Sequence, residues 1–204
     1  MIFNAKGFLF DMDGTLVDST AVVESVWRDF CAEYGLDSQA VIAYAHGRQT
    51  IDTLTHFIGA GEKTNKIAAS LEEVEINTTE GVTEVKGAAA LLSKLPPDSW
   101  ALVTSASRML AENRMKAANL PLPIVMVCAE DVMTGKPSPE GYIKAALAFN
   151  PVSSSTSRRT ASEGVSPTSA HPPGRLHNPS AASFTIRIRL LRRINARTSV
   201  LGVA

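Results

Sequence analysis

Residues 7–15 read Gly-Phe-Leu-Phe-Asp-Met-Asp-Gly-Thr, a short apolar run followed by two aspartates and a glycine. A short apolar run that ends in a glycine turn is typical of a buried strand in a parallel sheet. Two further apolar runs, at residues 100–103 and 124–128, follow it and alternate with segments of helical periodicity. Strands that alternate with helices favour an α/β fold, in which helices cover a parallel sheet.

The segment between the first two predicted strands is long and polar. Apolar residues recur at helical spacing up to Tyr34, where Gly35 can end a helix. Residues 38–80 are also mostly helical in pattern, but they are too polar to lie across a sheet. We therefore expect a small helical insertion at residues 18–81. Further helices are predicted at residues 86–95, 108–119 and 141–149, and a loop at residues 130–140.

The charge balance divides the chain into two unlike parts. Its 204 residues include 20 basic and 20 acidic ones. Residues 1–150 hold 12 Lys and Arg against 19 Asp and Glu, whereas residues 151–204 hold eight Arg, no Lys and only Glu163 as an acid. Residues 153–180 are rich in Ser, Thr, Pro, Gly and Arg, a composition typical of irregular chain. Only residues 184–190 of this tail alternate with the period of a strand.

Several classes of protein are disfavoured. The zero net charge of the whole chain argues against a nucleic-acid or membrane-surface protein. No apolar run approaches the roughly 18 residues of a transmembrane helix, and no secretory signal is recognisable. Cys31 and Cys128 lie far apart and lack metal-ligand spacing. We expect a cytoplasmic monomer that binds neither nucleic acid nor a membrane.

Asp11 and Asp13 follow the first predicted strand. Because residues i and i+2 of an extended chain point to the same side, both carboxylates can face one site. In open α/β sheets that site lies at the carboxyl ends of the strands. A divalent cation would relieve the repulsion between the carboxylates, and one could attack a phosphorus centre while the other moves a proton. The same pattern also suits a simple strand-end turn, in which Asp and Gly are ordinary residues.

The ends of the other two predicted strands also carry polar groups. Thr104 and Ser105 follow the second strand and open a helix, where hydroxyl and backbone N–H groups can bind an anion or merely cap the helix. Lys136, between Gly135 and Pro137, follows the third strand and can neutralise a phosphate and a nucleophilic carboxylate together. A lone Lys, however, is usually solvated. Three such groups at successive strand ends favour a single phosphate-handling site.

Residues 8–19 (FLFDMDGTLVDS), 102–107 (LVTSAS) and 130–142 (EDVMTGKPSPEGY) resemble, in order and spacing, the first three motifs of the haloacid dehalogenase-like hydrolase superfamily. Residues 45–54 (AHGRQTIDTL) resemble the branch of fungal and yeast phosphatases that act on 2-deoxyglucose 6-phosphate, glycerol 3-phosphate and related sugar or polyol phosphates. The resemblance implies a Rossmann-like core at residues 1–17 and 82–152, a helical cap at residues 18–81 and an irregular basic tail at residues 153–204.

The resemblance also implies a role for individual residues. Asp11 would be the nucleophile and would bind Mg²⁺ through its carboxylate, together with the backbone oxygen of Asp13. Asp13 would be the general acid and base. Lys136 would stabilise the phosphoaspartate, and Thr104, with Ser105 beside it, would hold phosphate oxygens. The implied substrate is a small sugar or polyol phosphate, although a phosphosugar mutase would use the same residues.

Five residues of the implied cap would face either the site or the interior of the cap. His46, Gly47 and Arg48 would face the site, where Arg48 could grip a phosphate or hydroxyls bidentately. The pattern equally allows Arg48 to be a solvated helix end and His46 to be a partly buried structural residue. His56 and Trp27 are expected to be packing residues.

A fourth motif of the family, an acidic pair that completes the magnesium site, has no counterpart here. Residues 157–164 read Ser-Arg-Arg-Thr-Ala-Ser-Glu-Gly, without an apolar strand or an acidic pair. Mg²⁺ prefers six oxygen ligands in octahedral geometry, so we expect weaker metal binding without the acidic pair. The missing strand would leave a sheet edge uncovered. An alternative to an active enzyme is therefore a catalytically impaired remnant.

We hypothesise that the tail is an out-of-frame or unspliced reading of a longer gene. The rival hypothesis is a basic extension that binds an acidic partner.

Overall fold

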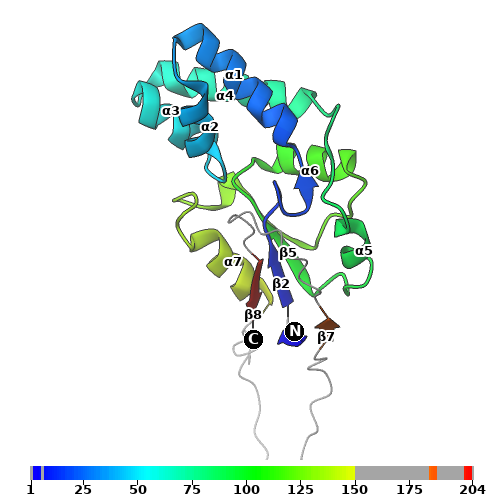
Figure 1. The fold of residues 1–204 in the computed structure, drawn as a ribbon. Helices are drawn as coiled ribbons and strands as arrows, with labels where there is room; N and C mark the ends of the chain where they lie inside the picture. The colour runs from blue at the N-terminus through cyan, green and yellow to red at the C-terminus, as the bar shows by residue number, and fades with distance from the viewer. Residues whose placement is uncertain (1, 6, 150–183, 188–199, 204) are drawn as a thin grey trace, which may run out of the picture.

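The computed structural model describes residues 2–5, 7–149, 184–187 and 200–203 (Figure 1). The elements in chain order are β1 (Ile2–Ala5), β2 (Gly7–Phe10), β3 (Val17–Asp18), α1 (Thr20–Tyr34), α2 (Ser38–Ala45), α3 (Thr50–Ile58), α4 (Glu62–Asn77), β4 (Thr83–Glu84), α5 (Ala88–Leu92), β5 (Trp100–Val103), α6 (Arg108–Ala117), β6 (Val125–Val127), a 3₁₀ turn (Ala129–Asp131), α7 (Glu140–Phe149), β7 (Phe184–Arg187) and β8 (Val200–Val203).

The central sheet has the strand order β6-β5-β2-β8. β2 pairs in parallel with β5, which pairs in parallel with β6, so that Phe10 lies beside Leu102 and Leu102 beside Met126. Smaller two-stranded sheets join β1 with β7 and β3 with β4. The parallel arrangement of β2, β5 and β6 confirms the predicted α/β fold.

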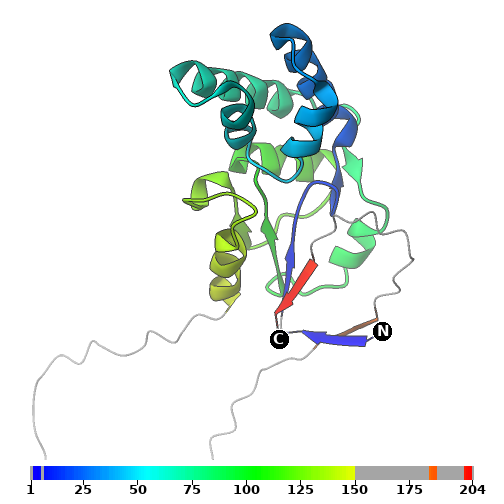
Figure 2. The same cartoon turned by 60° about the vertical axis from the view of Figure 1, so that its left-hand side comes forward.

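β2 is buried on both faces because helices cover both sides of the sheet (Figures 1 and 2). Alternate residues of a strand point to opposite faces. Phe8 and Phe10 therefore pack with Trp100 and with the inner faces of α5 and α6, whereas Leu9 packs on the other side with Ala145 of α7. This two-sided burial explains why the strand is a continuous apolar run rather than an alternating one.

Helices α1 to α4, residues 20–77, form a separate four-helix unit beyond the carboxyl ends of β2 and β5 (Figure 1). The unit has an apolar core of its own, in which the expected packing residue Trp27 is 3% exposed. His56 is exposed, but its ring stacks on Tyr44 with 4.1 Å between centroids. The buried core of the unit consists of Trp27, Phe30, Cys31, Val41, Ala45 and Leu54. That residues 18–81 make a cap domain remains a prediction.

Two predicted helices are shorter than expected. α5 covers five residues rather than residues 86–95, because Gly87 before it has a left-handed φ of 96° and the chain after Leu92 continues in i→i+3 turns. α6 ends at Ala117 rather than at Asn119, which has a φ of 53°. Asn tolerates this left-handed conformation better than most residues, so it can end a helix.

The tail contributes two strands where we expected irregular chain. β7 pairs with β1, and β8 pairs antiparallel with β2. The expectation of an irregular tail is therefore corrected for residues 184–187 and 200–203, of which the first lie in the alternating stretch. The expected uncovered sheet edge is also wrong, because β8 supplies hydrogen-bonding partners for β2. The remainder of residues 153–204 lies outside the described residues.

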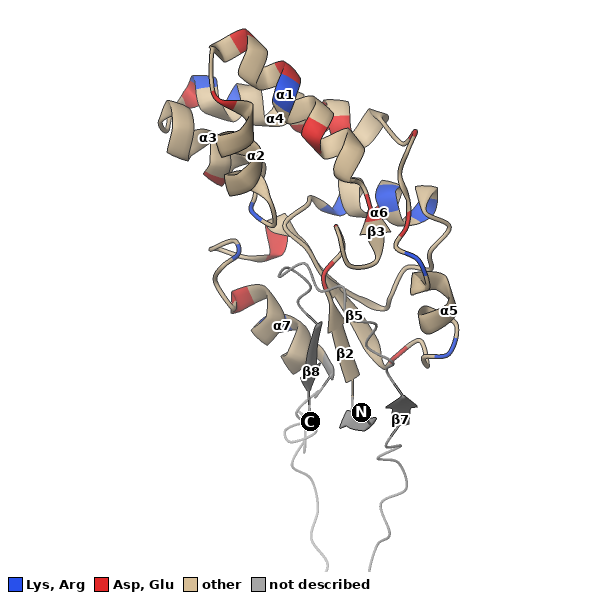
Figure 3. Cartoon of the chain, viewed as in Figure 1, with Lys and Arg blue, Asp and Glu red and all other residues tan. Residues whose placement is uncertain are grey.

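Charged residues are absent from the centre of the sheet and abundant on the helices (Figure 3). β2 and β5 contain none, whereas α4 alone contains six: Glu62, Lys63, Lys66, Glu72, Glu73 and Glu75. No described helix is both long enough and apolar enough to span a membrane. The charged groups at the strand ends therefore contrast with the uncharged strands before them, and they line one cleft.

Candidate active site

A cleft of about 1300 Å³ lies between the carboxyl ends of the central strands and the four-helix unit. Every residue predicted for the site lines this cleft: Asp11, Asp13, His46, Gly47, Arg48, Thr104, Ser105 and Lys136. They come from the loops after β2, α2, β5 and β6. The fold thus brings together side chains that lie up to 125 positions apart in the sequence, as Asp11 and Lys136 do.

The loop after β2 turns both aspartates toward the cleft. Met12, between them, is fully buried, and its carbonyl accepts hydrogen bonds from the backbone N–H groups of Leu16 and Val17 at 2.9 and 3.0 Å. Gly14 has a left-handed φ of 74° and permits the tight turn. Because the buried Met12 anchors the turn, Asp11 and Asp13 on either side of it face the opposite way, into the cleft.

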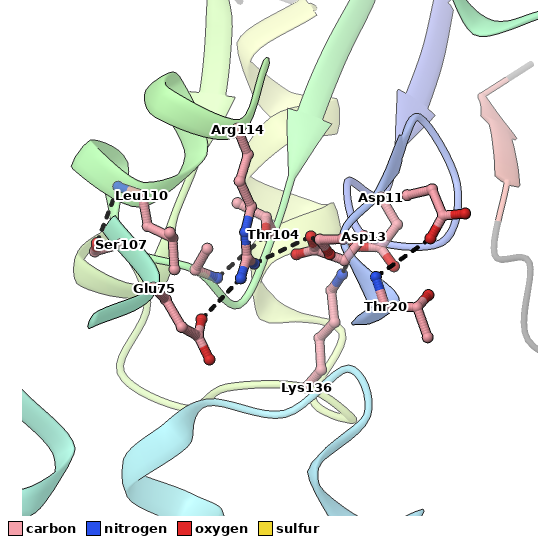
Figure 4. A network of polar contacts seen from close by, with 12 residues as sticks. Asp11, Asp13, Thr20, Glu75, Thr104, Ser107, Leu110, Arg114 and Lys136 are labelled. Carbon is pink, nitrogen blue, oxygen red and sulfur yellow. Dashed lines mark hydrogen bonds and ion pairs between the residues drawn. The ribbon is translucent and has the colours of Figure 1, made fainter. Parts of the chain in front are cut away.

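Asp11 and Lys136 form a partly buried ion pair. The Nζ atom of Lys136 lies 2.5 Å from Oδ1 of Asp11, and it also donates to the carbonyl of Val103 at 2.9 Å. Burial raises the pKa of Asp11, and the neighbouring Lys136 opposes this shift. Lys136 thus holds the carboxylate at the end of β2 in one orientation (Figure 4). The Asp11 oxygen Oδ2 is not used in this contact.

Asp13 belongs to a second network of charges. Its Oδ1 accepts a hydrogen bond from the Ser19 hydroxyl at 2.6 Å and another from Nη1 of Arg114 at 3.1 Å. Nη2 of Arg114 donates to Oε2 of Glu75 on α4 at 2.8 Å. Burial raises the pKa of Glu75, and the charge of Arg114 acts against this. The network connects the loop after β2, α6 and the four-helix unit (Figure 4).

The residues predicted from the sequence do not include Arg114, Glu75 or Ser19. The sequence does carry a signal for Arg114, because its neighbours at i−4 and i+4 are the apolar residues Leu110 and Ala118, and the structure buries both. An arginine on the apolar side of a helix needs buried anionic partners. The sequence could not show which carboxylates these are, because the partners lie 39 and 101 positions away.

Thr104 and Ser105 occupy different positions at the end of β5. Thr104 is 6% exposed, and its hydroxyl oxygen accepts a hydrogen bond from the N–H of Ala106 at 3.1 Å. Ser105 donates its hydroxyl to the carbonyl of Gly47 at 2.9 Å, which joins the sheet end to the four-helix unit. Neither residue caps α6, because Ser107 does so by accepting from the N–H of Leu110.

Arg48 lies on the wall of the cleft that the four-helix unit provides. Its guanidinium carbon is 4.4 Å from the centre of the Tyr44 ring, which is itself stacked on His56. This cation–π contact holds the planar group in place. No carboxylate within the described residues forms an ion pair with Arg48, so its hydrogen-bond donors remain available to an anion. His46 and Gly47 precede it in the same loop, and Gly47 has a left-handed φ of 76°.

The cleft offers part of a magnesium shell. Mg²⁺ is usually held by one or two carboxylates, and waters and substrate phosphates complete its octahedron. Asp11 and Asp13 supply two carboxylates, but one oxygen of each already accepts hydrogen bonds from protein side chains. Across the part of the chain that the structure describes, no group of three or more His, Cys, Asp or Glu side chains could hold a metal ion. The donors present fit magnesium as a minimal site made of the Asp11 carboxylate and the backbone oxygen of Asp13, to which waters and a substrate phosphate would add the remaining ligands.

Glu140 fixes the loop that carries Lys136. Its two carboxylate oxygens accept hydrogen bonds from the backbone N–H groups of Met133 and Thr134, both at 2.9 Å, and it pairs with Lys144 at 2.8 Å. The hydrogen bond with Lys144, together with the two backbone donors, lowers the pKa of Glu140 from 4.5 to about 2.

We expect Glu140→Gln to destabilise the fold at neutral pH and to have no effect in strong acid. Because the pKa of Glu140 is lower in the folded state, its carboxylate stabilises the fold above pH 4.5, and this contribution is lost as the pH falls through about 2. Urea unfolding at a series of pH values measures the effect. Glu112→Gln, at an exposed position of α6, is the matched control. A difference from wild type that persists undiminished at pH 2 would contradict the assignment.

The α/β core, the helical insertion and the strand-end cleft define the class of protein. A family model described as haloacid dehalogenase-like hydrolase matches residues 8–156, and the chain belongs to this family. Among solved structures, β-phosphoglucomutase from Clostridium difficile has a TM-score of 0.63 at 17% identity, covering 72% of this chain and 71% of that chain. A hydrolase from Pseudomonas syringae has a TM-score of 0.61 at 23% identity, covering 70% and 69%. These two likenesses show the fold.

Three relatives match more specifically. Hexitol phosphatase A of Escherichia coli (strain K12) is 48% identical over 143 residues, which cover 68% of this chain and 66% of the relative. 2-deoxyglucose-6-phosphate phosphatase 1 of Saccharomyces cerevisiae is 36% identical, covering 70% and 64%, and glycerol-1-phosphate phosphohydrolase 2 of the same yeast is 35% identical, covering 67% and 56%. The predicted resemblance to sugar and polyol phosphatases is confirmed. The chain spans less than two thirds of the length of each of these relatives.

Proposed function

We propose that the chain is a magnesium-dependent phosphatase that hydrolyses a small sugar or polyol phosphate through an aspartyl-phosphate intermediate. The observation that carries the proposal is the Asp11–Lys136 pair at the end of β2, where a carboxylate held by a cation lines the cleft. The similarity to hexitol, 2-deoxyglucose-6-phosphate and glycerol-1-phosphate phosphatases supports the class of substrate. As expected from the sequence, we also propose a cytoplasmic monomer without nucleic-acid or membrane partners.

The proposed reaction has two steps, and both use side chains that line the cleft. In the first, Oδ2 of Asp11 attacks the phosphorus in line with the leaving alkoxide, which takes a proton from Asp13. In the second, Asp13 removes a proton from a water molecule, which attacks the phosphoaspartate and releases inorganic phosphate. Asp11 is then regenerated as a carboxylate. Lys136 stays beside Asp11 throughout and offsets the negative charge that gathers there.

The phosphate and the rest of the substrate contact different walls of the cleft. On the sheet side, Thr104 and Ser105 line the same cleft as Asp11, and they would hold phosphate oxygens. On the opposite wall, Arg48 presents N–H donors that match phosphate or hydroxyl oxygens. Mg²⁺ would be held by the carboxylate of Asp11 and the backbone oxygen of Asp13, and when bound it would neutralise charge on the phosphate oxygens.

Release of inorganic phosphate from a panel of sugar and polyol phosphates tests the proposal. The purified full chain is incubated with a hexitol phosphate, 2-deoxyglucose 6-phosphate and glycerol 1-phosphate, with Mg²⁺ and with EDTA in its place. We expect release from at least one compound, and its loss in EDTA. Release that is equally fast in EDTA would contradict the metal dependence, and no release from any compound would contradict the phosphatase function.

An impaired remnant is the second candidate, because residues 157–164 lack the acidic pair of the fourth motif. A remnant should release no phosphate as it stands, but should regain activity when an acidic fourth motif is grafted onto the chain. A phosphosugar mutase would instead need a bisphosphate activator and would release little free phosphate. The same panel, with the graft and with a bisphosphate added, therefore separates the three functions.

A further inference from the structure

Arg114 of α6 lies between two carboxylates from different parts of the fold (Figure 4). One, Asp13, belongs to the loop after β2, and the other, Glu75, belongs to α4 in the four-helix unit. The side chain of Arg114 is 5% exposed and that of Glu75 is 8% exposed. A buried guanidinium is tolerated only where carboxylates compensate for its lost hydration. Arg114 therefore holds both carboxylates, and neither can move away without leaving a buried charge less compensated.

A second polar contact joins the same two helices. The side-chain amide of Asn113 donates to the backbone carbonyl of Ile76 at 3.3 Å. Asn113 is the neighbour of Arg114 on α6, and Ile76 is the neighbour of Glu75 on α4. The two contacts therefore lie side by side where α6 meets α4. Asp13 lies at the other end of the Arg114 guanidinium. A displacement of α4 from α6 would therefore disturb the group that orients Asp13.

We propose that Arg114 is a positioning residue that couples the docking of α4 to the orientation of the Asp13 carboxylate. Oδ1 of Asp13 accepts the hydrogen bonds of Arg114 and Ser19, which leaves Oδ2 for proton transfer. Ser19 directly precedes α1, and Glu75 lies in the last turns of α4. Asp13 thus contacts Ser19, at the start of the four-helix unit, directly, and it is linked to Glu75, near the end of that unit, only through Arg114. The inference rests on the proposed role of Asp13 as general acid and base.

Loss of the coupling should affect turnover more than substrate binding. We expect Arg114→Gln to lower kcat by about 10- to 100-fold, because misplacing a reacting group by about 1 Å can cost two orders of magnitude. Glu75→Gln should lower kcat by about 5- to 10-fold, because it removes the contact between α4 and Arg114 but leaves the contact between Arg114 and Asp13. KM should change by less than about threefold in both variants. The double variant should be within about twofold of Arg114→Gln, since both changes break one linkage.

Two measurements on the full chain test the coupling. The first is kcat and KM on the most rapidly hydrolysed compound of the panel, for the two single variants, the double variant and Arg114→Lys. Arg114→Lys keeps the charge but not the two-pronged geometry, so it should recover part of kcat. The second is the side-chain carboxyl ¹³C resonance of Asp13, assigned by its absence in Asp13→Asn. Glu75→Gln should shift this resonance, whereas Glu73→Gln, at an exposed position of the same helix, should not.

Two results would overturn the proposal. One is a double variant in which the separate losses in kcat multiply. The other is an Asp13 resonance that Glu75→Gln and Glu73→Gln leave equally unchanged. If the wild-type chain releases no phosphate, the proposed function fails, but the resonance comparison still decides whether Glu75 and Asp13 are linked through Arg114.

Discussion

Asp11→Asn should reduce the release of phosphate by about four orders of magnitude or more, as the loss of a nucleophile does in enzymes that work through a covalent intermediate. Asn has nearly the shape of Asp but lacks the anionic oxygen that would attack phosphorus. Lys136 would then donate to a neutral amide oxygen in place of a carboxylate. Single-turnover measurements with the best compound of the panel should show neither released phosphate nor a phosphorylated protein.

Asp29→Asn is the matched control for this change. Asp29 is exposed on α1 and does not line the cleft, so the same substitution there should leave the rate within about twofold of wild type. Circular dichroism and urea unfolding should show that Asp11→Asn remains folded. Full activity in a folded Asp11→Asn protein would rule out Asp11 as the nucleophile and with it the aspartyl-phosphate intermediate.

Lys136→Met should lower kcat by about 10²- to 10³-fold, the usual cost of removing one preorganised electrostatic group from an active site. Met has a similar length and volume but no charge. The Asp11 carboxylate would lose the cation 2.5 Å away, and the carbonyl of Val103 would lose its side-chain donor. Steady-state kinetics measure the loss, and Lys116→Met, at an exposed position of α6, should leave kcat unchanged.

Stability provides an independent readout of the same pair. We expect Lys136→Met to lower the free energy of unfolding at pH 7 by about 1–3 kcal/mol, because a partly buried carboxylate is left without its partner. Adding Asp11→Asn to this variant should restore part of the loss, since the unpaired charge is then removed. A double variant less stable than Lys136→Met would show that the two side chains do not interact as the structure indicates.

Local sequence patterns predicted the parallel strands β2 and β5 more closely than the ends of helices α5 and α6. β5 covers residues 100–103 as predicted, because four apolar residues with polar neighbours on the carboxyl side leave little choice of strand. Helix ends depended on single backbone conformations, such as the left-handed φ of Gly87 and Asn119, which a periodic pattern does not reveal. The pairing of β8 with β2 joins residues about 190 positions apart in the chain, and no local pattern indicated it.

The residues of the cleft also differ in how far local sequence patterns predicted them. Asp11 and Thr104 were predictable because each comes directly after an apolar run, and Lys136 because it lies in the loop that follows a third run. The carboxyl ends of parallel strands meet at one edge of a sheet. The network of Asp13, Arg114 and Glu75 was not predictable, since its members come from a loop and two helices whose relative placement depends on side-chain packing.

Short-range patterns and composition were enough to predict the family, the strand-end residues and the division between an acidic body and a basic tail. The set of charges that are buried together depends instead on how the folded elements pack. Burial of Arg114 is possible where α4 and the loop after β2 converge on α6, and that convergence exists only after the four-helix unit has docked on the sheet. Which buried charges pair with one another depends on the folded structure as a whole and not on any single segment of the chain.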